Sequence, residues 1–199
     1  MQRSKKEFPF VADLLLEFKK AKLSARAQLF LVSLMALYYE RERRKGGEVT
    51  IGFTEGSHFD FDITVRDSEI SRRFNFSVDT LWRIRKDLKK KTPITYRRTK
   101  VFKRGVKYPY KARFKKNFDH EFYYGFSVLK KNEKIILVPS KIIYNKKLTT
   151  KEKLSILWHS KLKEEFARSP ELKEIEEASE ISVKTIRKAK EKCPQIFAE

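Results

Sequence analysis

Between residues 77 and 91 the chain reads SVDTLWRIRKDLKKK, which places hydroxyl and cationic side chains along one face of a predicted helix. Apolar residues recur at Val78, Leu81, Ile84 and Leu88, a spacing that predicts a buried stripe on the opposite face. Hydroxyl groups at the start of such a helix can reach phosphates or base edges, and an arginine can donate two parallel hydrogen bonds to guanine. The residues expected on this face are Ser77, Asp79, Thr80, Arg83, Lys86 and Lys90. Trp82 lies at the edge of the stripe, and we expect it to pack at the rim of the core rather than to contact a base.

The charge of the whole chain favours a polyanionic partner. Its 47 Lys and Arg residues outnumber 26 Asp and Glu residues, giving +21 at pH 7. Nucleic acid is the first candidate, and an anionic membrane surface is the second. We expect no membrane partner, because no apolar run of the length of a membrane span is present and the cations are spread along the chain. The single cysteine excludes an internal disulfide framework and favours an intracellular, cytoplasmic protein.

The residues around this helix predict a helix-turn-helix followed by a basic hairpin. Asp67 or Ser68 can cap a preceding helix, Asn75 suits a left-handed turn, and Ser77 can cap the next helix. After Thr92-Pro93, two alternating runs flank a turn at residues 103–106, which predicts a two-stranded wing. Thirteen basic residues and no acidic one lie between Lys89 and Lys116. The cations expected to contact the nucleic-acid backbone are Arg97, Arg98, Lys100, Lys103, Arg104 and Lys107. The alternative is a solvated charged hairpin that only keeps the protein soluble.

The helix-turn-helix pattern occurs a second time. Residues 179–193, SEISVKTIRKAKEKC, repeat the Ser-Val-x-Thr core in the same phase. Val183, Ile186, Ala189 and Cys193 form the expected buried stripe. The residues expected on the outward face are Lys184, Thr185, Arg187 and Lys188. The preceding segment is acidic and no clear wing follows, so binding of DNA and binding of a protein partner both remain open for this second unit.

The segments that precede the two motifs are also similar to each other. Each has a short apolar helix, a Lys-Lys pair, a capping Ser24 or Thr149 and a long amphipathic helix. Two alternating runs at 49–53 and 58–63 predict a β-hairpin insertion in the first copy. The expected fold is therefore α+β and mainly helical, with two tandem winged-helix or helix-turn-helix units. We place them at 1–131 and 132–199, the first with the hairpin insertion and the basic wing.

Catalysis is the weakest of the hypotheses. His58, Asp60 and Asp62 would share one face of a strand, an arrangement that could hold a metal ion in a metal-dependent nuclease. The alternative is an amphipathic hairpin with its phenylalanines in the core. No phosphate loop of the GxxxxGK[ST] kind is present. We expect no enzyme activity, no cofactor and no bound metal.

These motifs together resemble a known family. The segments KLSARAQLFLVSLMALYYE and SEISRRFNFSVDTLWRIRKDLKKK, followed by a basic hairpin, resemble the winged-helix domain of plasmid and phage replication initiators, including replisome organisers. The segment KIILVPSKIIYNKKLTTKEKLSIL is similar to the start of such domains. The resemblance implies sequence-specific binding of double-stranded DNA at repeated origin sites by a monomer or homodimer. It also implies a host replicative helicase or its loader as a partner. Winged-helix transcriptional regulators share the Ser-Val-x-Thr motif and are the alternative.

Overall fold

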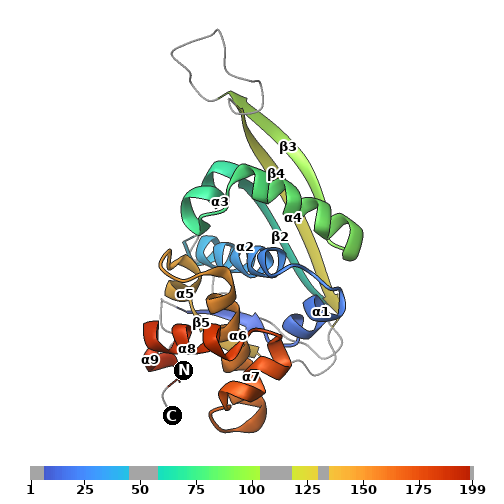
Figure 1. Ribbon diagram of the computed structural model, residues 1–199. Coiled ribbons are helices and arrows are strands. Elements are labelled where there is room, and N and C mark those ends of the chain that lie inside the picture. The colour runs from blue at the N-terminus through green and yellow to red at the C-terminus, as the bar shows by residue number, and fades with distance from the viewer. Residues whose placement is uncertain (1–6, 45–57, 104–117, 130–134, 198–199) are drawn as a thin grey trace. The chain divides into compact units, whose positions relative to one another are not determined.

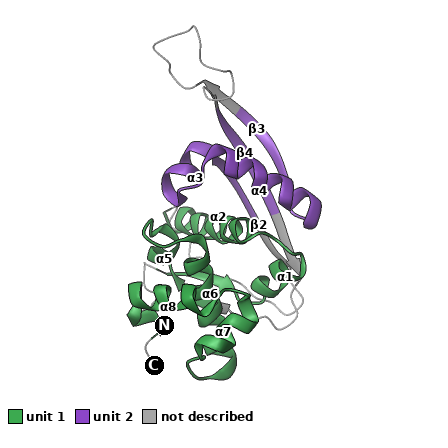
Figure 2. Ribbon diagram, viewed as in Figure 1, with its two compact units in different colours: residues 1–53, 131–199 green, residues 54–130 purple. Residues whose placement is uncertain are grey.

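The computed structural model describes residues 7–44, 58–103, 118–129 and 135–197 (Figure 1). These residues form an α+β fold that is mainly helical and contains small antiparallel sheets, as expected from the sequence. The chain divides into two compact units (Figure 2). Unit 1 combines residues 1–53 with residues 131–199, and unit 2 consists of residues 54–130.

A pair of short strands joins the N-terminal and C-terminal segments of unit 1. Strand β1 (Glu7–Val11) runs antiparallel to β5 (Ile135–Pro139), with Phe10 opposite Ile136. Both of these side chains are buried. Because strands this short bury few side chains, the pair depends on helices that cover it.

Each of these strands is followed by a short helix and a long one. After β1 come α1 (Leu14–Lys20) and α2 (Ala25–Arg44), and after β5 come α5 (Ser140–Tyr144) and α6 (Thr150–Phe166). The long helices α2 and α6 pack against each other. The two similar segments of the sequence are therefore two copies of one strand-helix-helix arrangement, and the copies pack together.

The last helices of the chain pack on α6. They are α7 (Leu172–Ser179), α8 (Val183–Lys192) and α9 (Pro194–Phe197), and both α7 and α8 contact α6. The Lys192 ammonium lies 2.7 Å from the buried carboxylate of Glu152, so the end of α8 is tied to the first turn of α6.

The N-caps expected for the two long helices are confirmed. Thr149 and Glu152 form a reciprocal capping box, in which the Thr149 hydroxyl accepts from the Glu152 amide and the Glu152 carboxylate accepts from the Thr149 amide. The Ser24 hydroxyl accepts from the amide of Ala27 at 3.3 Å. These bonds satisfy amides that the helix itself leaves without an acceptor.

Unit 2 is a three-stranded antiparallel sheet with two helices. The strands are β2 (His58–Arg66), β3 (Thr95–Lys103) and β4 (Phe118–Leu129), in the order β2-β4-β3. Between β2 and β3 the chain forms α3 (Asp67–Phe74) and α4 (Val78–Lys91). Helix α3 packs on β2 and β4.

Strand β4 is the partner of both other strands of unit 2. Strand β2 pairs with β4, and β3 pairs with residues 118–125 of β4. The hairpin predicted between 49–53 and 58–63 involves residues outside the described part of the chain, so it stays a prediction. Residues 45–57 and 104–117 lie outside the described part of the chain. The turn residues alone suggested local hairpins. The observed register instead places Tyr96 beside Tyr124, with ring centroids 6.1 Å apart, and so builds one continuous aromatic face.

The compact units do not follow the expected domains 1–131 and 132–199. The chain does pass between units at Lys131, close to the expected boundary, but residues 1–53 belong with the C-terminal segment. The reason is that β1 pairs with β5 and α2 packs on α6, which joins residues 1–53 to the C-terminal segment.

Candidate nucleic-acid interface

The connection between α3 and α4 is a tight turn of three residues. Helix α3 ends at Asn75, whose backbone is left-handed with φ 61° and ψ 35°. Asparagine tolerates this conformation better than most residues because its short side chain can hydrogen-bond locally. Phe76 is buried beneath the turn, and the Ser77 hydroxyl caps α4 by accepting from the Thr80 amide at 3.2 Å. The described residues here thus form two helices joined by a short turn with a left-handed Asn75.

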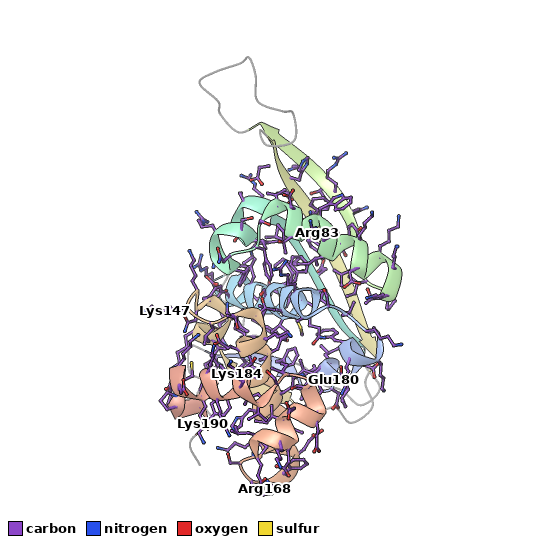
Figure 3. The ribbon with its side chains drawn as sticks, in the orientation of Figure 1. Arg83, Lys147, Arg168, Glu180, Lys184 and Lys190 are labelled. Atoms are coloured by element: carbon purple, nitrogen blue, oxygen red, sulfur yellow. The ribbon has the colours of Figure 1, made fainter. Side chains whose placement is uncertain are left out.

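Helix α4 has one buried face and one exposed face. Leu81, Ile84 and Leu88 are buried, as the apolar spacing predicted. On the other side of the helix Thr80 is half-buried, and its hydroxyl lies 2.8 Å from that of Ser77. The other residues expected on this face are exposed, and Figure 3 labels Arg83 among them. The exposed residues from the predicted set are Ser77, Asp79, Arg83, Lys86 and Lys90.

Two apolar residues of α4 are not where the sequence placed them. Val78 is 39% exposed and Trp82 is 59% exposed, although Val78 was expected in the buried stripe and Trp82 at the rim of the core. The Lys86 ammonium lies 4.5 Å from the centre of the Trp82 ring. The buried face is rotated away from these residues because Arg85, rather than Val78, completes it.

Arg85 is a buried residue of this region whose role in positioning α4 was not predicted from the sequence. Its guanidinium donates to both carboxylate oxygens of Asp67 and, at 2.8 Å, to the Tyr124 hydroxyl. It also lies over the Phe122 ring, 3.6 Å from the centroid. Burial raises the pKa of Tyr124, so the phenol stays neutral beside the guanidinium. These contacts fix α4 to the start of α3 and to β4, and thereby hold the exposed face of α4 in place.

The start of α3 is capped from a neighbouring strand. Asp67 and Ser68 were the expected capping residues, but the N-cap position is Arg66, which makes no side-chain cap bond. Asp119 of β4 instead accepts from the Ser68 amide at 3.0 Å and from the Ser68 hydroxyl. Asp67 is buried in its ion pair with Arg85, which explains why it does not act as a cap.

Strand β3 adds exposed cations to unit 2. Arg97, Arg98 and Lys100 are exposed, and the Arg97 guanidinium lies 5.3 Å from the centre of the Tyr123 ring. Lys103 ends β3, but its side chain is not described. Arg104 and Lys107, also expected in the wing, lie outside the described residues.

Helices α7 and α8 are joined by a similar left-handed turn, although Ser182, unlike Ser77, makes no side-chain cap bond. Glu180 ends α7 with φ 57° and ψ 25°, Ile181 is buried beneath the turn, and Ser182 precedes α8. The Ser182 and Thr185 hydroxyls lie 3.1 Å apart, and the corresponding Ser77 and Thr80 hydroxyls lie 2.8 Å apart.

The residues of α8 lie as the sequence predicted, with two exceptions, Val183 and Thr185. Ile186, Ala189 and Cys193 are buried, whereas Val183 is only half-buried. The predicted outward residues are exposed apart from the half-buried Thr185. Figure 3 labels Lys184 among them. They are Lys184, Thr185, Arg187 and Lys188.

The first helices of the two motifs differ in charge. The exposed Arg72 of α3 corresponds to the exposed Glu177 of α7, and Asn75 corresponds to Glu180. Glu180 forms an ion pair with Lys19 at 3.1 Å. In helix-turn-helix proteins the first helix crosses the nucleic-acid backbone, so carboxylates at these positions oppose phosphate contact. The second motif is thus the less cationic of the two.

The metal hypothesis gains no geometric support from the described residues. Asp62 is exposed, and the side chains of His58 and Asp60 are not described. Within the ranges that the structure covers, no group of three His, Cys, Asp or Glu residues is placed to hold a metal ion. Across the same ranges, no helix is long and apolar enough to cross a membrane.

No family model, no curated protein and no solved structure matches this chain.

Proposed function

We propose that this protein has a winged-helix unit that binds double-stranded DNA in a sequence-specific manner through α4. The main support is the exposed face of α4. It presents Arg83 and Lys86 beside the hydroxyls of its first turn, opposite a face held rigidly by Leu81, Arg85 and Leu88. A helix that is anchored on one side and cationic on the other fits the width of a major groove.

Strand β3 supplies the sequence-independent part of the proposed binding. Its exposed cations follow α4 directly in the chain and lie in the same unit. Cations in such a position neutralise phosphates and release counterions, which strengthens binding to any duplex. In this proposal α4 reads bases, while Arg97, Arg98 and Lys100 contact the backbone.

The motif of α7 and α8 is a second and weaker DNA-binding element in this proposal. Lys184, Arg187 and Lys188 give α8 an exposed cationic face, but Glu177 and Glu180 oppose phosphates near its start. Two DNA-binding elements in one chain strengthen binding only if both contact the duplex at the same time. We therefore expect variants of α8 to weaken binding less than variants of α4.

The biological role that we propose is replication initiation at repeated sites of a plasmid, phage or other mobile element. It rests on the resemblance of the segments at 22–40 and 68–91 to replication initiators. An initiator would bind repeated sites, as a monomer or homodimer, and would recruit a host replicative helicase or its loader.

Selection of bound fragments from the source genome tests this proposal. The purified protein is mixed with the fragments at about 150 mM salt, where charge-driven binding is weakened more than specific binding. Footprinting then locates the sites. Direct repeats beside the gene for this protein would support an initiator, and a single palindrome at a promoter would indicate a transcriptional regulator. The absence of any enriched sequence would contradict specific binding.

Two substitutions separate base reading from backbone contact. Arg83→Ala should weaken binding to the selected site by about 1–3 kcal/mol and relax the preference at one base pair. Lys100→Ala should weaken binding to all sequences alike and lower the salt slope by about one. Both side chains are exposed, so each variant should keep its fold. Equal losses on selected and random DNA for Arg83→Ala would refute a base-reading role.

A further inference from the structure

Val78 and Trp82 form an exposed apolar ridge on α4. They lie four residues apart, and therefore on the same side of the helix in consecutive turns. Single exposed apolar residues are common on protein surfaces, but here a valine and a tryptophan are adjacent. Exposing an indole to water forgoes much of the stabilisation that its burial would provide, so a binding partner can recover that stabilisation.

Cations lie along the C-terminal side of this ridge, whereas the exposed Asp79 lies beside Val78 at its start. Lys86 lies over the Trp82 ring, Arg83 is the next residue along the chain, and Lys89 is exposed on the following turn. A partner that covers the ridge must therefore combine apolar groups with negative charge close by. The major groove of DNA does so, because phosphates border it and the thymine methyl group is the apolar group that it presents.

We propose that Val78 and Trp82 contact thymine methyl groups next to the base pair read by Arg83. This inference rests on the proposed binding of DNA by α4. It adds specificity for thymine, which neither an arginine nor a phosphate-binding lysine provides. The position of the ridge in the first two turns of α4 agrees with the use of N-terminal residues of a recognition helix for base contacts.

Replacing thymine by uracil in the selected site tests the contact, because uracil lacks the methyl group but keeps the same hydrogen-bonding edge. In a scan of single replacements, one or two positions should weaken binding of the unchanged protein roughly fourfold, the effect of burying one methyl-sized group. Trp82→Ala should weaken binding to the thymine site at least as much. The variant should then bind thymine and uracil equally at one of those positions.

Lys90→Ala is the matched control, since Lys90 is exposed on the same helix but outside the ridge. This variant should bind more weakly to every duplex and keep the full sensitivity to uracil. Melting temperatures of both variants should equal that of the unchanged protein, because neither side chain is buried.

The outcomes separate this inference from the proposed function. If selection yields a site that Arg83→Ala weakens, but no uracil replacement matters, DNA binding stands and the thymine contact is refuted. The thymine contact is also refuted if Trp82→Ala keeps the sensitivity of the unchanged protein to uracil. It is refuted equally if this variant binds every duplex as the unchanged protein does. If selection yields no site, both the proposed specific binding and the thymine contact fail.

Discussion

Arg83 and Arg85 lie two positions apart on α4 and have opposite environments. Arg83 is exposed, whereas Arg85 is buried against Asp67, Tyr124 and Phe122. The helical period of the apolar residues predicted that Arg83 is exposed. It could not identify the buried one, because the residues that pair with Arg85 lie 18 and 39 positions away in the chain. The same contact decides which way α4 is rotated. It explains why Val78 and Trp82 are exposed, although Val78 was expected in the buried stripe and Trp82 at the rim of the core.

Removing Arg85 should destabilise the protein strongly. We expect Arg85→Ala to lower the free energy of unfolding by about 3–5 kcal/mol, because the carboxylate of Asp67 would remain buried without its partner. Arg83→Ala on the same helix is the control and should change it by at most about 0.5 kcal/mol. Urea denaturation followed by circular dichroism measures both values. Similar small effects in the two variants would mean that the buried ion pair does not hold α4 in place.

The helices were predictable where local signals mark their ends. Ser24, Ser77 and Thr149 each cap a helix as expected, and Asn75 adopts the left-handed conformation that the turn requires. The strand partners were not predictable in this way. Strands β1 and β5 are five residues long and lie more than 120 positions apart, so no local pattern indicates their pairing.

The residue that ends α6 tests whether local backbone conformation contributes to stability as expected. Ala167 ends the helix with φ 52°, a left-handed conformation in which glycine carries no penalty. We expect Ala167→Gly to raise the free energy of unfolding by about 0.5–1 kcal/mol. Ala178→Gly, within α7, should lower it by a similar amount because glycine is a poor helix former. Thermal unfolding of the two variants would show shifts of opposite sign; a lower melting temperature for Ala167→Gly would contradict the role of the left-handed cap.

At the scale of the whole chain, the sequence shows the repeat but does not show that its two copies pack against each other. Two similar segments suggested two consecutive domains, whereas the strand-helix-helix copies pack with each other inside unit 1. Side-chain contacts cross between the copies as well. The Tyr144 hydroxyl lies 2.6 Å from the Glu40 carboxylate, and the Lys161 ammonium lies 3.8 Å from that of Asp13. A sequence repeat predicts that its two copies have similar structures, but it does not predict which elements each copy packs against.

This packing predicts that the fragment 132–199 does not fold alone. Without residues 1–131, β5 loses its only described partner strand and α6 loses α2, which exposes apolar side chains of both elements. The fragment contains a single tryptophan, Trp158, which is 2% exposed in the whole chain. Its fluorescence should be that of a solvent-exposed indole, and the fragment should show no cooperative transition in urea.

Mixing the fragment with residues 1–131 should restore the buried emission of Trp158, provided that the N-terminal fragment carries Trp82→Phe so that only one tryptophan reports. Recovery is expected because the β1–β5 and α2–α6 contacts can form again between the two fragments. A Phe10→Asp variant of the N-terminal fragment is the control and should not restore the signal, since Phe10 is buried in β1. Cooperative unfolding of 132–199 by itself would instead support two independent domains in sequence order.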